Sequence, residues 1–86
     1  YFNNSAIALV NQGRVDEAIG LYTNAIKVLP TRDKVHLLEF NIGLAHKKRE
    51  HFGKAAEAFA RSLLTLPTYE KSYAAMAESL HEAKKK

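Results

Sequence analysis

Apolar residues recur every three or four positions along most of the chain, which is the spacing of one face of an α-helix. Two stretches show this most clearly, and each ends at one of the two prolines, Pro30 and Pro67. Proline lacks the amide hydrogen that a helix interior requires, so each proline marks a helix end. The apolar stripes are Ala18, Leu21, Tyr22, Ala25, Ile26 and Leu29 in the first stretch, and Ala55, Ala58, Phe59, Ser62, Leu63 and Leu66 in the second.

Two further breaks divide these stretches into shorter helices. Gly13 can adopt the left-handed turn that ends a helix, and Glu50 and His51 interrupt the second stretch at a similar place. No segment alternates convincingly between apolar and polar residues, as a strand would. The expected helices span residues 2–12, 15–29, 34–48, 52–65 and 69–84. The pattern therefore predicts an all-α fold with five helices and no sheet.

Internal duplication is the strongest signal in the chain, because two copies agree in both residue type and spacing. The first copy reads Phe2, Ser5, Ala6, Leu9, Ala18, Tyr22, Ala25 and Pro30. The second copy reads Ile42, Gly43, His46, Ala55, Phe59, Ser62 and Pro67, and a third opening follows as Tyr73, Met76, Ala77 and Leu80. The small residues Ala6, Ala18, Ala25, Gly43, Ala55 and Ser62 favour close helix crossings. The larger ones, including Leu80, are expected to fill the spaces between helices.

The duplicated unit resembles the tetratricopeptide repeat, whose signature runs large-x-x-Leu-Gly-x-x-Tyr, then Ala-x-x-x-Phe, then Pro. The resemblance covers essentially the whole chain and implies a right-handed α-solenoid of antiparallel helix pairs. It divides a single domain into a first repeat at 1–32, a second at 34–68 and a capping helix at 69–86. The chain departs from the family because Pro30 and Pro67 lie 37 residues apart, more than the usual period. His46 also replaces the usual tyrosine.

In this family, the first helices of successive repeats line a concave groove that receives a partner peptide or helix. The resemblance therefore implies a protein partner that carries apolar and acidic groups. Asn41 could bind a ligand main chain, since its amide both donates and accepts hydrogen bonds, and the lysines could attract acidic groups. The groove positions fall on Asn3, Ile7, Val10, Asn11, Leu37, Phe40, Asn41, Leu44, Lys48 and Lys71.

One subclass of these repeats clamps a partner's terminal carboxylate with a fixed set of lysine, arginine and asparagine side chains. Here Asn41 and Lys71 match that set. Asn3, Ile7 and Ala75 occupy its other positions and do not match. We therefore expect no carboxylate clamp of this type.

The third predicted helix is apolar on two sides, independently of any resemblance. A helix of this kind is either buried on both sides or buried on one and free to bind on the other. The sequence leaves both alternatives open. One stripe consists of Leu38, Ile42 and Ala45, and the other of Leu37, Phe40 or Asn41, and Leu44.

Charge and composition narrow the classes of partner. The net charge of +4 includes three lysines at the end of the chain, residues 84–86, so the remainder is nearly neutral. A nucleic-acid-binding protein would be expected to show a broad basic face, so we do not expect this function. The longest apolar run, Ala6 to Val10, is too short to span a membrane. The absence of cysteine fits a reducing compartment, and we expect a cytoplasmic protein.

Residues that could support catalysis or metal binding are sparse. His46 and Glu50 lie one helical turn apart and His51 follows them, but His51 falls at an expected turn, so the pattern supplies no third ligand for a metal such as zinc. The serines lack a nucleophile motif, and the glycines form no phosphate-binding loop. We therefore expect no enzyme activity, no metal and no cofactor.

The sequence favours an interaction module over other classes of function. The chain begins at Tyr1 rather than methionine, so we expect it to be part of a longer protein, in which it serves recruitment or scaffolding, for example in signalling. The alternative is a structural module that self-associates or stacks through exposed apolar helix faces. The apolar side of the last helix, with Tyr73, Met76 and Leu80, is the candidate surface for such stacking.

Overall fold

The computed structural model describes residues 2–28 and 34–85, with the backbone alone described for residues 2–5. These ranges contain five α-helices and no strand, which confirms the all-α prediction. The described helix ends agree with the predicted ends to within one residue. Leu29 and Pro30, the predicted end of the second helix and the proline after it, lie outside the described residues. The helices are α1 (Phe2–Asn11), α2 (Val15–Val28), α3 (Val35–Lys48), α4 (Phe52–Thr65) and α5 (Glu70–Lys84).

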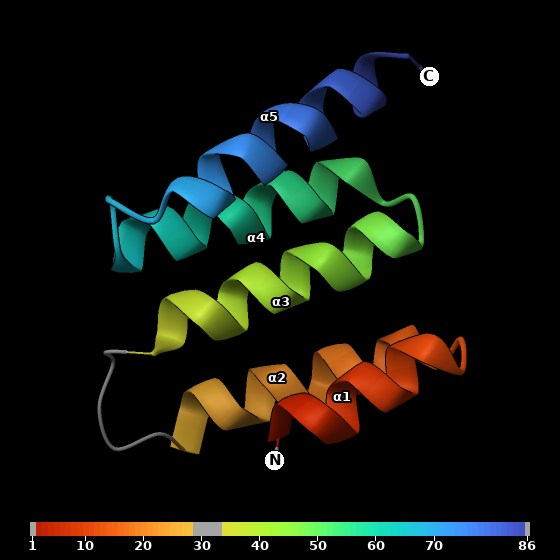
Figure 1. The fold of residues 1–86 in the computed structure, drawn as a ribbon. Helices are drawn as coiled ribbons and strands as arrows, with labels where there is room; N and C mark the ends of the chain where they lie inside the picture. Colours follow the sequence, from red (N-terminus) through yellow and green to blue (C-terminus); the bar gives the residue numbers. More distant parts are fainter. Residues whose placement is uncertain (1, 29–33, 86) are drawn as a thin grey trace.

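The helices pack consecutively, each against the next one in the chain. Figure 1 shows them as a row in which α5 forms one edge, while α1 lies in front of α2 at the other. The Cα atoms extend over 38 × 31 × 15 Å, so the row is broad and thin. Because a helix with its side chains is about 10–12 Å across, a row this thin leaves many side chains at a surface.

The turns after α1 and α3 have the same backbone geometry. Gly13 and Glu50 both adopt a left-handed conformation, with φ angles of 82° and 61°. In each turn the next amide donates to a carbonyl five residues back, at 2.8 Å for Arg14 and 2.9 Å for His51. This is the hydrogen-bond pattern that commonly ends a helix. The two predicted breaks are therefore confirmed, and they repeat the same turn 37 residues apart.

The core consists of two clusters of buried residues. A cluster between α1, α2, α3 and α4 contains Ala6, Ala18, Tyr22, Ala25, Leu38, Ile42 and Ala58. A second cluster contains Ala55, Phe59 and Ala75, with Phe40 and Met76 packed against it. The small residues at which the sequence predicts close helix crossings are all buried: Ala6, Ala18, Ala25, Gly43, Ala55 and Ser62.

The last helix departs from one prediction. Leu80 does not fill a space between helices, because its side chain is 47% exposed. Helix α5 instead buries Ser72, Ala75 and Ser79. Within the described part of the chain, α4 is the only helix with extensive contacts to α5, so one side of α5 remains uncovered.

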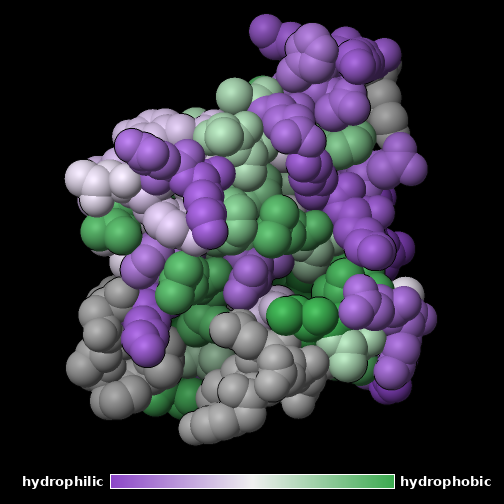
Figure 2. All heavy atoms as spheres, in the orientation of Figure 1, coloured by the Kyte–Doolittle hydropathy of each residue, from purple (hydrophilic) through white to green (hydrophobic). Residues whose placement is uncertain are grey.

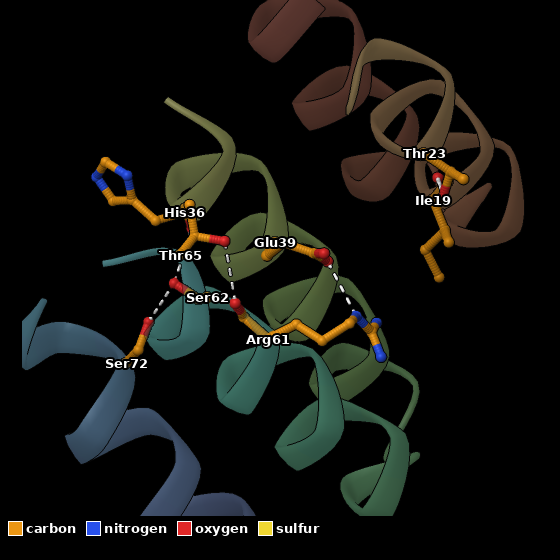
Figure 3. Close-up of polar contacts among 8 residues, drawn as sticks. All are labelled: Ile19, Thr23, His36, Glu39, Arg61, Ser62, Thr65 and Ser72. Atoms are coloured by element: carbon orange, nitrogen blue, oxygen red, sulfur yellow. Dashed lines mark hydrogen bonds and ion pairs between the residues drawn. The ribbon is translucent and has the colours of Figure 1, made fainter. Parts of the chain in front are cut away.

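Hydroxyl groups connect α3, α4 and α5 inside the protein (Figure 3). Ser72 Oγ donates a hydrogen bond to Ser62 Oγ at 2.8 Å, and Ser62 Oγ donates to the backbone carbonyl of His36 at 2.8 Å. Both serines are fully buried. Because each hydroxyl group has a partner, the buried polar atoms fix the relative positions of three helices at little desolvation cost.

Candidate functional site

A hollow of about 230 Å³ lies between α1, α2 and α3, and we call it the α1–α3 hollow. Its volume is below the range usual for cofactor sites, about 300–1,000 Å³, and suits a single side chain better than a cofactor. The hollow is lined by Ile7, Val10, Tyr22, Asn41, Leu44, Ala45 and Lys48.

Helical spacing explains how the walls of the hollow form. Ile7 and Val10 are three residues apart on α1, while Leu44 and Lys48 are four apart on α3, so each pair shares one helix face. The rim is open, because the side chains of Ile7 and Leu44 are 50% and 40% exposed. Figure 2 shows apolar residues gathered in the middle of the face on which α1 lies.

Two buried residues that the sequence analysis had placed only in the core also line the hollow. Tyr22 of α2 and Ala45 of α3 are each 2% exposed. Burial raises the pKa of the Tyr22 hydroxyl above its ordinary value, so the ring remains neutral at physiological pH. The regular stripes on α2 and α3 predicted that both residues would be buried, but could not show that a space would remain beside them.

The structure brings together five of the predicted groove residues and separates the others. Asn11 and Lys71 are exposed but do not line the hollow, and neither does the half-buried Leu37. The side chain of Asn3 lies outside the described residues. The five that line the hollow are Ile7, Val10, Asn41, Leu44 and Lys48.

Phe40 packs away from the hollow, contrary to the role that we expected for it. Its ring centroid lies 5.4 Å from that of Phe59 on α4 and 5.5 Å from that of Tyr69, just before α5. These separations are typical of aromatic pairs that stabilise a core. The second stripe of α3 is thus divided, because Phe40 packs against the protein whereas Leu44 remains open to solvent.

The charges around the α1–α3 hollow favour an anionic group. None of the seven side chains that line it is acidic, and Lys48 contributes the only charged group among them. The neighbouring Lys47 forms an ion pair with Glu78 of α5. Lys48 is exposed at the rim, where it could meet an acidic group of a ligand without first losing much hydration.

A second hollow, of about 330 Å³, lies between α2, α3 and α4. It is more polar, and its lining includes Arg61 Nε, which binds Glu39 Oε1 at 3.2 Å. Figure 3 shows this pair across from Ile19 and Thr23 of α2, where the Thr23 hydroxyl donates to the Ile19 carbonyl. The opposite charges of Glu39 and Arg61 offset one another, which leaves Lys27 as the remaining charged side chain of this lining.

His46 also lines the second hollow, where its pKa is lowered. Burial is the main cause, followed by the positive charge of Lys54 and the nearby His51. The rings of the two histidines have centroids 6.3 Å apart. Within residues 2–28 and 34–85, no group of three or more histidine and acidic side chains could hold a metal ion.

Comparison of the chain with protein-family models, with curated proteins and with solved structures found no significant match. Among the helices that the structure describes, none combines the length and apolar character needed to cross a membrane. The functional interpretation therefore depends on the geometry of the α1–α3 hollow and on the residue pattern.

Proposed function

We propose that this chain is a protein-interaction module that holds a short peptide segment in the α1–α3 hollow. The observation that carries the proposal is an apolar hollow with an exposed rim, formed by Ile7 and Leu44, that has one cation, Lys48, at its edge. Exposed apolar residues gathered around a concave space are typical of binding sites. The proposed activity is binding without catalysis.

The apolar part of the hollow would receive an aliphatic side chain of the partner. Such a side chain would lie above Tyr22, between Ile7 on one wall and Leu44 on the other. Each methylene group removed from water in this way contributes about 0.8 kcal/mol to binding. This term favours leucine or isoleucine in the partner.

Polar groups at the rim would orient the peptide. The amide of Asn41 can donate to a ligand carbonyl and accept from a ligand amide. Lys48 would pair with an acidic residue that follows the aliphatic one. Since one side chain and a few polar contacts provide the binding energy, we expect a dissociation constant of about micromolar order.

This proposal is consistent with the repeated pattern of the chain. The equivalent turns at Gly13 and Glu50 support two copies of one helical hairpin. We propose that the copies form a right-handed solenoid of the tetratricopeptide type, with its groove over α1 and α3. Within a longer protein, such a module would recruit or position a partner that carries the recognised segment.

The experiment that tests this function uses a short acetylated peptide with a central leucine followed by aspartates. Two-dimensional NMR spectra of the isotope-labelled chain would be recorded as the peptide is added. We expect saturable shifts for Ile7, Val10 and Leu44. Replacing leucine with serine in the peptide should abolish them, because the apolar contact is lost.

Matched variants distinguish binding in the α1–α3 hollow from nonspecific hydrophobic binding elsewhere on the surface. Leu44→Ser and Lys48→Glu should each weaken binding by about tenfold or more, which corresponds to about 1.4 kcal/mol. Leu64→Ser is the control, because Leu64 is 84% exposed on α4 and does not line the hollow. If Leu64→Ser weakens binding as much as Leu44→Ser, the hollow is not the site.

A further inference from the structure

The outward side of α5 carries a regular stripe of exposed residues that is separate from the α1–α3 hollow. The stripe consists of Glu70, Tyr73, Ala77, Leu80 and Lys84, with alternating spacings of three and four residues. This is the spacing of a seam along which two helices pack. All five residues are exposed, including the large apolar side chains of Tyr73 at 51% and Leu80 at 47%.

The stripe lies on the solvent-exposed side of α5, with its centre about 150° around the helix axis from the centre of the buried face. Ser72, Ala75 and Ser79 face α4, and at 100° per residue the stripe residues project from the other side of the helix. Figure 1 shows α5 at the edge of the row of helices. The stripe is therefore accessible to another helix without any rearrangement of the core.

The charges at the two ends of the stripe make it complementary to itself. Ala77 lies at the centre, with Glu70 seven residues before it and Lys84 seven residues after it. When two copies of α5 pack antiparallel about Ala77, Glu70 of each copy lies opposite Lys84 of the other. The same arrangement places each Tyr73 beside the other copy's His81, and each Leu80 beside the other copy's Ala74.

We propose that the outer stripe of α5 is a homodimer interface, in which two copies of this chain pair antiparallel with Ala77 at the two-fold axis. Ala77 has the smallest side chain of the stripe, so it allows the closest approach of the two helices where they cross. An interface of this kind is isologous, since the same residues serve both copies. A single helix pair buries little surface, so the dimer should be weak.

The positions of Glu70 and Lys84 also have a simpler explanation, so the experiment must distinguish pairing between copies from stabilisation of α5 itself. An acidic residue in the first turn and a basic residue in the last turn each stabilise a helix through its dipole. Helix stability therefore cannot be the readout. The mass of the particle in solution distinguishes the two, because only pairing between copies changes it.

Sedimentation equilibrium of the chain provides this readout, at concentrations from about ten micromolar to about one millimolar, which spans weak association. We expect the average mass to rise with concentration from 9.6 kDa towards twice that value. Ala77→Glu should abolish the rise, because it places two like charges at the two-fold axis. A mass that stays at 9.6 kDa for the unmodified chain over the whole range overturns the proposal.

Charge reversals test the specific pairing. Glu70→Lys and Lys84→Glu should each weaken the dimer by about tenfold, and the double variant should restore it, because the pairs re-form with opposite sign. General repulsion between basic chains predicts instead that Lys84→Glu strengthens association. Glu57→Lys on exposed α4 is the control, because it changes the net charge as Glu70→Lys does. Failure of the double variant to recover overturns the proposed register.

Discussion

The ring of Phe59 occupies the space in which a side chain at Gly43 would lie. A Cβ atom placed on Gly43 would be 2.5 Å from Phe59 Cε1 and 2.7 Å from Cδ1. Gly43 is in the middle of α3 and Phe59 is in the middle of α4, and both are buried. The missing side chain therefore determines how closely these two helices cross.

Gly43→Ala should destabilise the protein by about 1–3 kcal/mol, because the added methyl group forces the ring of Phe59 or the two helices to shift. Urea unfolding followed by circular dichroism measures the change. Gly20→Ala is the matched control, since no atom lies within 4 Å of its added Cβ. That variant should stabilise α2 by about 0.5–1 kcal/mol, because alanine favours a helix interior.

A second substitution tests whether Phe59 causes the cost. Phe59→Leu alone should destabilise the core, but in combination with Gly43→Ala the two changes should cost less than their sum. The smaller side chain leaves room for the added methyl group. Strictly additive losses would show that the strain at Gly43 comes from elsewhere.

The two left-handed turns predict opposite responses to substitution. Gly13→Ala should destabilise the protein by about 1 kcal/mol, because residues with a Cβ atom resist a positive φ angle. Glu50→Gly should stabilise it by up to about 1 kcal/mol for the same reason. Thermal unfolding would measure both changes, and a loss of stability in Glu50→Gly would contradict this account.

Two buried serines, Ser62 and Ser79, should respond differently to replacement with alanine. Ser62→Ala removes the acceptor of the Ser72 hydroxyl and should cost about 1–2 kcal/mol. Within the described residues, the buried hydroxyl of Ser79 has no partner, so Ser79→Ala should be neutral or stabilising. Chemical unfolding of both variants tests the contrast. Equal losses would show that the hydrogen bonds do not determine the effect.

Acidification should weaken the fold through His46. Its folded pKa is lowered from 6.5, mainly by burial, so in the window below 6.5 the unfolded chain binds the proton more readily. The stability contributed by neutral His46 is therefore complete above pH 6.5 and is lost as the pH falls through the lower, folded pKa. His46→Leu should flatten this part of the stability profile.

The five helices were predictable because their signals are local. The apolar spacing of α2 and α4 and the left-handed turn at Gly13 are properties of short segments. The sequence could not predict which residues of the second apolar stripe of α3 would be buried, because that depends on the segments that pack beside α3. Phe40 is covered by Phe59 and Tyr69, which lie in other segments.

The same reasoning explains the partial prediction of the hollow. The resemblance to the tetratricopeptide repeat implied that Ile7 and Leu44 line one groove, and both line the hollow. The pattern also assigned Leu80 to the interior, because it fills the same place in its copy as His46 does in the second. His46 has α4 beside it, whereas no described helix covers Leu80, and no periodicity in the sequence conveys that difference.

The consecutive packing of the helices has a consequence for how the chain opens. Helix α3 is held by α2 and α4, whereas α1 and α5 each have one extensive neighbour. Backbone amides of the outer helices should therefore exchange with deuterium sooner than those of α3. An occupant of the α1–α3 hollow would touch α1 and α3 together. Such a ligand would link α1, which has the fewest contacts, to α3, which is packed on two sides. Slower deuterium exchange of the α1 amides would therefore report that the hollow is occupied, even for a ligand that leaves the fold unchanged.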